Sequence, residues 1–273
     1  MGIPNKNHVQ LRRLEGMENT IKKKLGKNEN VFGTFIMTNG LDTAEIIAHA
    51  GADCIMIDGE HGSMDLETAG RMVSIIRGTS TVPLLRVAGN EPSLIKRGLD
   101  TGAAGIMIPM VNTKEEAEAA VKLCKYPPMG VRGMGAGRAI LFGAGAEEYE
   151  NYFKHANDEV LVIVQIEHEQ AVDNIEEILS VPGIDIAFVG PLDLSTSMGL
   201  SGQLTHPEVQ KQCLKVVEAC QKHHVVPGIM SWSGGMEQHL KMGFKFLLGG
   251  IDASILYKGV RELVKEFKSS TKS

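Results

Sequence analysis

Four polar residues of this chain could carry out chemistry together, because each lies at or just beyond the end of a short apolar run. His61 follows the run CIMID, and Arg86 lies in PLLRV. Glu167 ends VLVIVQIE, and Asp193 comes just after IAFVG. An imidazole, a guanidinium and two carboxylates can supply a base, an anion partner and ligands for a cation. Their placement predicts an enzyme site at the carboxyl ends of parallel strands.

The two carboxylates are the candidate metal ligands. Gln165 and Glu167 are two residues apart, so both project from the same side of their strand, near its end. Glu167 and Asp193 follow consecutive strands and could hold one hard divalent cation such as Mg²⁺ or Mn²⁺. Two structural roles remain open: Glu167 could cap a helix that opens at Glu169, and Asp193 could cap a turn before Ser195.

Arg86 indicates an anionic substrate, and His61 indicates proton transfer. A guanidinium at the end of an apolar strand needs an anion, either a substrate carboxylate or enolate, or an ion-pair partner such as Asp58 or Asp100. In the motif DGEH, Asp58 ends a strand and His61 follows in a turn that can aim its imidazole over the site. His61 is therefore a candidate general base, and a solvated loop residue is the alternative.

Two other kinds of catalysis are disfavoured. An imine-forming aldolase needs a lysine at the carboxyl end of a strand, whereas Lys245 stands at the start of its run. Gly133, Gly135 and Gly137 resemble a dinucleotide-binding loop, but Arg138 breaks the pattern and no strand immediately precedes it. The sequence thus favours a metal as the electron sink.

The positioning elements are eight short apolar runs that alternate with amphipathic stretches. This alternation predicts a parallel sheet, and eight strands favour a closed (β/α)₈ TIM barrel over an open sheet. The apolar runs are VFGTFIM from Val31, CIMID from Cys54, PLLRV from Pro83, GIMIP from Gly105, VLVIVQI from Val160, IAFVG from Ile186, VPGIM from Val226 and FLLGG from Phe246. The predicted helices are Asp42–Ala50, Leu66–Ile76, Ser93–Asp100, Lys114–Lys125, Ala171–Leu179, Pro207–His223, Glu237–Met242 and Ile251–Lys268.

The domain organisation follows from these elements. Residues 1–30 form a polar, Lys-rich cap with a weak helical pattern through Leu11, Leu14, Ile21 and Leu25, which could pack across the barrel bottom. Residues 31–273 form a single barrel domain, a length typical of this fold. About 35 residues separate Lys125 from the next strand, and a loop of that length is usually functional or builds an interface.

Composition excludes several classes of protein. The 28 Lys and Arg against 33 Asp and Glu give a net charge of -5 with no basic block, so nucleic acid is not an expected partner. No apolar stretch approaches the roughly 18 residues of a membrane span. The four cysteines contain no C-x-x-C pair, which favours buried, reduced thiols and a cytoplasmic location.

Six motifs occur in order from about Asn30 to Lys268: IDGEH, LRV with a following N-x-P, MIPMV, YPP-x-G-x-RG, VQIE, and GP-x-DLS-x-x-MG. In this order they resemble the HpcH/HpaI family of class II pyruvate aldolases. The resemblance implies a TIM barrel of the phosphoenolpyruvate/pyruvate type and a cytoplasmic hexamer, a trimer of dimers whose final helix is exchanged between subunits. It also implies a divalent-metal-dependent aldolase that cleaves a 4-hydroxy-2-oxo acid to pyruvate and an aldehyde through a metal-bound pyruvate enolate.

The resemblance also assigns roles to residues of this chain. The metal, Mg²⁺, Mn²⁺ or Co²⁺, would be held by Glu167 and Asp193. Arg86, Gln165, Leu192 and Asp193 would contact the substrate, with Arg86 stabilising the enolate and the Leu192 backbone amide binding the pyruvate carboxylate. The catalytic group would comprise His61 as acid and base, Asp100 raising the basicity of His61, Arg86, and Asp58 at the end of the strand before His61.

Three other functions remain open. An oxaloacetate decarboxylase or macrophomate-synthase-like enzyme would use the same site without an aldehyde pocket. An acyl-CoA lyase is less favoured, because no basic cluster suits the CoA phosphates. A non-catalytic binding barrel has no need of all four polar residues. Leu192 stands where relatives often have Ala or Ser, and GMGAGRAILFGAG differs from the loops of relatives that act on long-chain hydroxy-keto-diacids, so the aldehyde half of the substrate stays unassigned.

Overall fold

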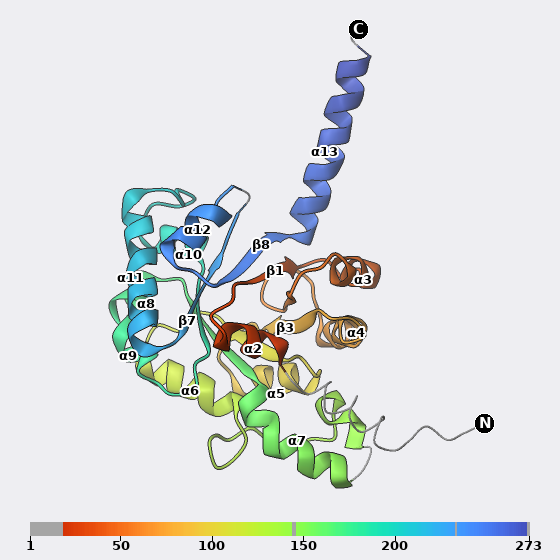
Figure 1. Cartoon of the computed structure of the whole chain (residues 1–273), viewed down its shortest axis with the longest axis vertical. Coiled ribbons are helices and arrows are strands. Elements are labelled where there is room, and N and C mark those ends of the chain that lie inside the picture. The colour runs from red at the N-terminus through yellow and green to blue at the C-terminus, as the bar shows by residue number, and fades with distance from the viewer. Residues whose placement is uncertain (1–18, 144–145, 233, 272–273) are drawn as a thin grey trace, which may run out of the picture.

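The core of the molecule is a closed barrel of eight parallel strands, joined β1 to β8 in chain order (Figure 1). The computed structural model describes residues 19–143, 146–232 and 234–271. The predicted (β/α)₈ TIM barrel is therefore confirmed. The strands are β1 (Val31–Ile36), β2 (Cys54–Asp58), β3 (Val82–Arg86), β4 (Gly105–Ile108), β5 (Leu161–Ile166), β6 (Ile186–Val189), β7 (Val226–Met230) and β8 (Phe246–Ile251).

The strands are apolar throughout because both of their faces are buried. In β5, Leu161 and Ile163 lie in a core cluster inside the barrel, whereas Val162 and Val164 lie in a second cluster between the strands and the helices. Side chains alternate along a strand, so each buried face needs an apolar residue at every second position. Every second residue of a strand faces the inside of the barrel. A polar residue at the next inward-facing position after the apolar ones therefore lies at the barrel mouth.

The helices surround the barrel, and all the expected ones except Ala171–Leu179 form with shifts of no more than two residues at their ends. Where caps occur, they follow the sequence: α6 begins with a capping box between Thr113 and Glu116. The helical elements are α2 (Thr20–Gly26), α3 (Leu41–His49), α4 (Leu66–Ile76), α5 (Pro92–Asp100), α6 (Lys114–Cys124), the 3₁₀ turn η1 (Arg138–Gly143), α7 (Ala146–Glu159), α8 (Glu169–Asp173), α9 (Ile175–Leu179), α10 (Pro191–Ser197), α11 (Pro207–His223), α12 (Met236–Met242) and α13 (Asp252–Ser270).

Helix α2 closes the amino-terminal end of the barrel. Ile21 is fully buried and belongs to the inner core cluster. Asn19 caps the helix, and its side-chain amide donates to the carbonyls of Ala104 (3.0 Å) and Glu159 (2.9 Å), which precede β4 and β5. Ile21 thus packs into the barrel core, whereas Leu11 and Leu14 lie outside the described residues.

The connection between Lys125 and Val160 was wrongly expected to be a loop, because it contains η1 and the 14-residue helix α7. The Phe153 ring packs edge-on against Tyr126, with ring centroids 4.9 Å apart. Asn157 exchanges hydrogen bonds with the backbone of Tyr126 (2.7 and 3.0 Å). The helix was missed because its largely polar sequence is stabilised by tertiary contacts, which periodicity does not reveal.

Two further differences lie in the second half of the barrel. The single helix expected over Ala171–Leu179 is divided into α8 and α9 at Asn174, which lies at ψ 10° and serves as the end of one helix and the start of the next. Helix α10 was not expected. Pro191 at its start suits the first turn of a helix, where no backbone donor is needed.

The last helix, α13, projects away from the barrel (Figure 1). Asp252 anchors its first turn by accepting hydrogen bonds from the backbone amides of Met37 (2.9 Å) and Thr38 (3.2 Å). Beyond Asp252 the helix is largely exposed, including the apolar side chains of Leu256, Val260, Leu263 and Phe267. Within the described part of one chain, this apolar stripe is left exposed.

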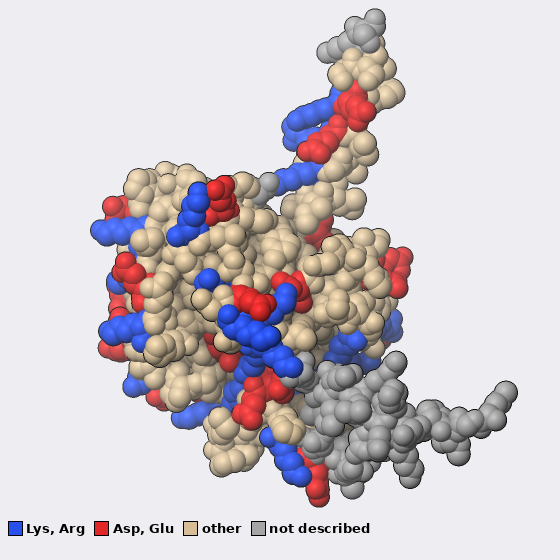
Figure 2. All heavy atoms as spheres, in the orientation of Figure 1, with Lys and Arg blue, Asp and Glu red and all other residues tan. Residues whose placement is uncertain are grey.

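Charges of both signs are mixed on the face of the molecule drawn in Figure 2. Lys and Arg side chains are interspersed there with Asp and Glu, without a broad field of one sign. No helix in the described part of the chain has the length and apolar character required to cross a membrane. All four cysteines are buried and unpaired, as expected.

Candidate active site

The end of β2 and the end of β3 form one side of the site. Asp58 and Arg86 face each other in the strand register and continue the inward series of Met56 and Leu84. Arg86 donates from Nε and Nη2 to the two carboxylate oxygens of Asp58, at 2.9 and 2.6 Å. Both residues are buried. The ion pair with Asp58, left open by the sequence, is therefore present, and it fixes the guanidinium by a bidentate contact.

The turn after β2 presents two more ionisable groups to this guanidinium. Asp58 accepts hydrogen bonds from the backbone amides of Glu60 (3.0 Å) and His61 (3.3 Å). Glu60 Oε2 lies 3.0 Å from Arg86 Nη1 and 3.9 Å from His61 Nε2. The His61 side chain is 58% exposed. Asp58 thus positions the turn and the guanidinium, while the imidazole remains open to a ligand.

Gly59 is required within this turn. A Cβ at Gly59 would lie 2.7 Å from the Arg86 carbonyl oxygen, closer than real Cβ contacts allow. The Gly59 amide instead donates to that carbonyl at 2.8 Å. The absence of a side chain lets the DGEH turn lie directly against the end of β3.

Gln165 and Glu167 form the opposite side, at the end of β5. Both are buried and continue the inward series of Leu161 and Ile163. Glu167 Oε1 accepts the Met110 amide at 2.9 Å, and the Gln165 side-chain amide donates to Glu167 Oε2. His168, and not Glu167, caps α8. The capping role considered for Glu167 is therefore wrong.

Asp193 and Leu192 lie in the first turn of α10, which follows β6. Both are exposed, Leu192 by 47%. Ser195 directs its own hydroxyl to the Leu192 carbonyl at 2.8 Å. Among the described residues, no hydrogen-bond donor is found for the Asp193 carboxylate, so the capping role considered for it is also not observed.

Electrostatics links the two sides of the site. Burial raises the pKa of Glu167 to about 7, and the carboxylates of Glu60 and Asp193 act in the same direction, while Arg86 opposes them. Burial likewise raises the pKa of Glu60, which Arg86 and His61 partly counteract. Several carboxylates therefore face one guanidinium, an arrangement that favours an added cation.

The donor set fits a hard divalent cation. No group of three or more His, Cys, Asp or Glu side chains in the described ranges is arranged as a complete metal cage. Glu167 and Asp193 nevertheless provide two carboxylates at one mouth, and the buried Gln165 Oε1 beside them has no hydrogen-bond partner. Oxygen donors from few protein groups, with positions left for water and substrate, are typical of Mg²⁺ or Mn²⁺ sites.

Asp100 is not part of this mouth. It is the last residue of α5 and precedes β4, so it lies at the amino-terminal end of the barrel, opposite His61. Its carboxylate pairs with Arg132 Nη2 at 3.3 Å. The ion pair considered between Arg86 and Asp100 is therefore wrong, and within one chain Asp100 cannot act directly on His61.

Two residues of the site escaped the sequence analysis. Glu60 contacts Arg86, although it was visible only as one letter of DGEH. Gly190 precedes α10, and a Cβ there would lie 2.9 Å from Glu167 Oε2 and 3.1 Å from Gln165 Nε2. The available signal was a glycine directly before Pro191, at the end of a predicted strand. Glycine has no side chain, so it lets two strand ends approach closely.

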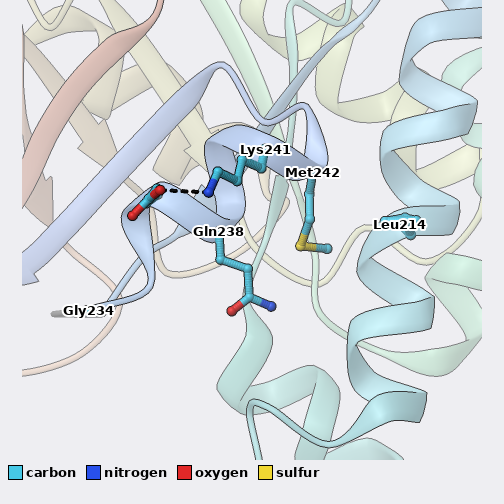
Figure 3. Close-up of a pocket in the computed structure, with 6 residues that line it drawn as sticks. Leu214, Gly234, Gln238, Lys241 and Met242 are labelled. Atoms are coloured by element: carbon cyan, nitrogen blue, oxygen red, sulfur yellow. Dashed lines mark hydrogen bonds and ion pairs between the residues drawn. The ribbon is translucent and has the colours of Figure 1, made fainter.

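Two hollows in the surface differ in whether they border the barrel mouth. One of about 450 Å³ is lined by Glu60, Asn90 and Met110, among others, and so borders the site. A groove of about 620 Å³ lies between α11 and α12, where Gln238 and Met242 lie on one side and Leu214 on the other (Figure 3). None of the predicted site residues lines that groove.

Comparison with known proteins agrees with this architecture. The sequence model of the HpcH/HpaI aldolase/citrate lyase family matches residues 32–258. The chain belongs to this family. It is 36% identical over 253 residues to a hydroxypyruvate/pyruvate aldolase of Roseobacter denitrificans, covering 92% of this chain and 97% of that protein. It is 34% identical over 252 residues to a 5-keto-4-deoxy-D-glucarate aldolase of Shigella boydii, covering 92% and 96%.

A solved HpcH/HpaI family structure superposes closely on the barrel. The protein from Burkholderia cenocepacia J2315 has a TM-score of 0.86 and 33% identity, with 92% of this chain and 99% of that chain covered. The resemblance seen in the sequence motifs is thereby confirmed. As a member of this HpcH/HpaI family, the protein is an enzyme of the aldolase type, a carbon–carbon lyase.

Proposed function

We propose that this HpcH/HpaI protein is a divalent-metal-dependent aldolase that cleaves a 4-hydroxy-2-oxo acid to pyruvate and an aldehyde. The observation that carries the proposal is the meeting of Arg86, Glu167 and Asp193 at one barrel mouth, with His61 open beside them. A guanidinium, two carboxylates and a base match the charges that develop when the bond between carbons 3 and 4 of a 4-hydroxy-2-oxo acid is cleaved.

Glu167 and Asp193 are the residues proposed to hold the metal, Mg²⁺, Mn²⁺ or Co²⁺. When bound, a divalent cation would neutralise the negative charge that develops on the keto oxygen during cleavage. The buried Gln165 amide would orient the Glu167 carboxylate and present its free carbonyl oxygen to the site. Residues around a metal ligand commonly fix its orientation in this way.

The remaining residues bind the substrate and move the proton. Arg86, held rigid by Asp58, would bind the carboxylate or enolate oxygen of the pyruvate half. His61 would remove the proton from the 4-hydroxyl, directly or through water. The bond between carbons 3 and 4 then breaks, the aldehyde leaves, and protonation of carbon 3 gives pyruvate. The Leu192 amide, in the first turn of α10, is proposed to bind the pyruvate carboxylate.

Assembly is proposed to complete the site. The apolar stripe of α13 is exposed within one chain, and a second subunit would cover it if the helix were exchanged between neighbours in a hexamer. Asp100 lies at the far end of its own barrel, so any effect on His61 must come from the Asp100 of a neighbouring copy. Both features favour a homo-oligomer as the active form.

The test is pyruvate release from a panel of 4-hydroxy-2-oxo acids and from oxaloacetate, with Mg²⁺ or Mn²⁺ and with EDTA. We expect metal-dependent cleavage of at least one hydroxy-oxo acid, abolished by His61→Ala. Activity on oxaloacetate alone would instead identify a decarboxylase that uses the same residues. Failure to release pyruvate from any of these compounds would contradict the proposal.

A further inference from the structure

The chain contains one tryptophan, and it lies at the same end of the barrel as the site. Trp232 follows the last residue of β7 by two positions. Its carbonyl accepts the Gly235 amide at 2.9 Å, so the backbone turns here before α12 begins. The strand ends that carry Arg86 and Glu167 open at the same mouth.

The Trp232 side chain packs against the apolar cluster inside the barrel. This inner cluster includes Phe35, Met230 and Phe246. The Arg86 guanidinium lies over the Phe35 ring, 4.8 Å from its centroid. Trp232 and Arg86 therefore both contact the apolar cluster inside the barrel.

The indole nitrogen of Trp232 is buried and has no hydrogen-bond partner in the described part of the chain. A buried indole N–H nearly always finds an acceptor, since leaving it unpaired costs about 1–3 kcal/mol. A donor without a protein acceptor beside the mouth is available to hydrogen-bond a ligand or a water.

The neighbouring residue holds this turn in place. Ser231 is fully buried, and its amide donates to the Leu248 carbonyl at 2.8 Å. Its hydroxyl lies 2.9 Å from His239 Nδ1 on α12. Ser231 thus connects β7 to both β8 and α12, and the adjoining indole is presented from a fixed strand end.

Resting on the proposed function, we propose that Trp232 is a specificity-determining residue for the aldehyde half of the substrate. The pyruvate half is assigned to Arg86, Glu167 and Asp193, on β3, β5 and the turn after β6, whereas the indole comes from β7. Its ring would cover the carbon chain of the aldehyde, and Nε1–H would donate to an oxygen on the carbon next to the carbonyl. An α-hydroxyaldehyde is the acceptor proposed to use this donor.

The first experiment compares glycolaldehyde with acetaldehyde as acceptors in aldol addition to pyruvate, with Mg²⁺. Trp232→Phe keeps an aromatic ring and removes the N–H. We expect its kcat/KM ratio for glycolaldehyde over acetaldehyde to fall about tenfold, the effect of one lost hydrogen bond. Trp232→Leu also removes the ring and should lower kcat/KM for both aldehydes. A ratio unchanged in Trp232→Phe would overturn the proposal, and partial unfolding cannot alter that ratio.

The second experiment uses the fluorescence of this single tryptophan. With Mg²⁺ and oxalate, a mimic of the pyruvate enolate, we expect glycolaldehyde to change the emission and acetaldehyde to change it less. The absence of any response to saturating glycolaldehyde would contradict contact with the aldehyde. Exchange of the pyruvate methyl protons in D₂O tests the proposed function separately. Absence of exchange would contradict the proposed aldolase activity, and the fluorescence response would still show whether Trp232 contacts the aldehyde.

Discussion

The charge of Arg86 is buried in an apolar barrel because carboxylates pair with its guanidinium. Its guanidinium satisfies Asp58 with two nitrogens and meets Glu60 with the third. Burying an unpaired guanidinium would cost several kcal/mol, so the paired carboxylate stabilises it and also fixes its direction. The residue can then meet a developing negative charge without reorganising.

Replacing Arg86 by Ala should lower kcat by about 100-fold or more, because the enolate loses its charged partner. The change also leaves the buried Asp58 without its charged partner and should lower the free energy of unfolding by about 3–5 kcal/mol. Steady-state kinetics and chemical denaturation would be measured together. Arg86→Lys is the matched control, since it keeps the charge but loses the bidentate pairing. An unchanged kcat in Arg86→Ala would exclude the proposed role.

The pKa of Glu167, raised to about 7 by burial, predicts a pH dependence of metal binding. A proton must leave the carboxylate before it binds a cation, so affinity should increase as the pH rises through that pKa. Ionisation of one group with a pKa of 7 predicts roughly tenfold tighter Mn²⁺ binding at pH 8 than at pH 6. Calorimetric titration at several pH values would measure this. Constant affinity over the range would mean that Glu167 is ionised throughout or is not a ligand.

At the scale of elements, the connection from β6 to α10 decides how closely the proposed metal ligands approach. Gly190 lies at φ -94°, which any residue can adopt, so its importance is steric. Gly190→Ala would press a methyl group against Glu167 Oε2. We expect metal affinity to fall by about tenfold or more, as for other changes around metal ligands.

The control for this substitution is Gly26→Ala, where a new Cβ would meet nothing within 4 Å. It should leave metal affinity and thermal stability nearly unchanged. Calorimetry on both variants would measure the difference. Equal metal affinities would show that the Gly190 backbone shifts easily and does not constrain Glu167.

At the scale of the whole molecule, α13 presents an apolar stripe that one chain leaves in solvent. Leu263 is 65% exposed and lies on the same stripe as Leu256, Val260 and Phe267. If a second subunit covers this stripe, Leu263→Asp should dissociate the oligomer, because a buried charge would lack a partner. Light scattering after size-exclusion chromatography would measure the mass. Lys265→Ala, on the same helix, should leave the mass unchanged, and a monomeric wild-type protein would contradict the proposed assembly.

The position of Asp100 predicts complementation between subunits. His61→Ala and Asp100→Ala chains should each have low activity as separate oligomers. Co-expressed in one oligomer, they should recover part of it, because some sites combine an intact His61 with the Asp100 of another copy. Mixing His61→Ala with Arg86→Ala is the control, since both residues belong to one mouth, and we expect less recovery. Absence of recovery in the first mixture would exclude Asp100 acting between chains.

The sequence by itself determined the barrel and most of the mouth. Strands buried on both faces must be apolar throughout, so their number and order can be read directly, and parallel strands place their carboxyl ends together. This geometry predicted that Arg86, Glu167 and Asp193 would share one end. The sequence left the contact between Arg86 and Asp58 as one alternative to a substrate anion. The register between two neighbouring strands is not visible in either apolar run alone.

Only the tertiary structure determined which residues from segments far apart in the sequence lie close together. It placed Asp100 opposite His61, revealed α7 through its contacts with Tyr126, and brought Glu60 to the Arg86 guanidinium. It also left the Trp232 nitrogen without a partner. Local periodicity encodes which face of an element is buried, but the identity of the neighbour across that face is set by how all the elements pack together.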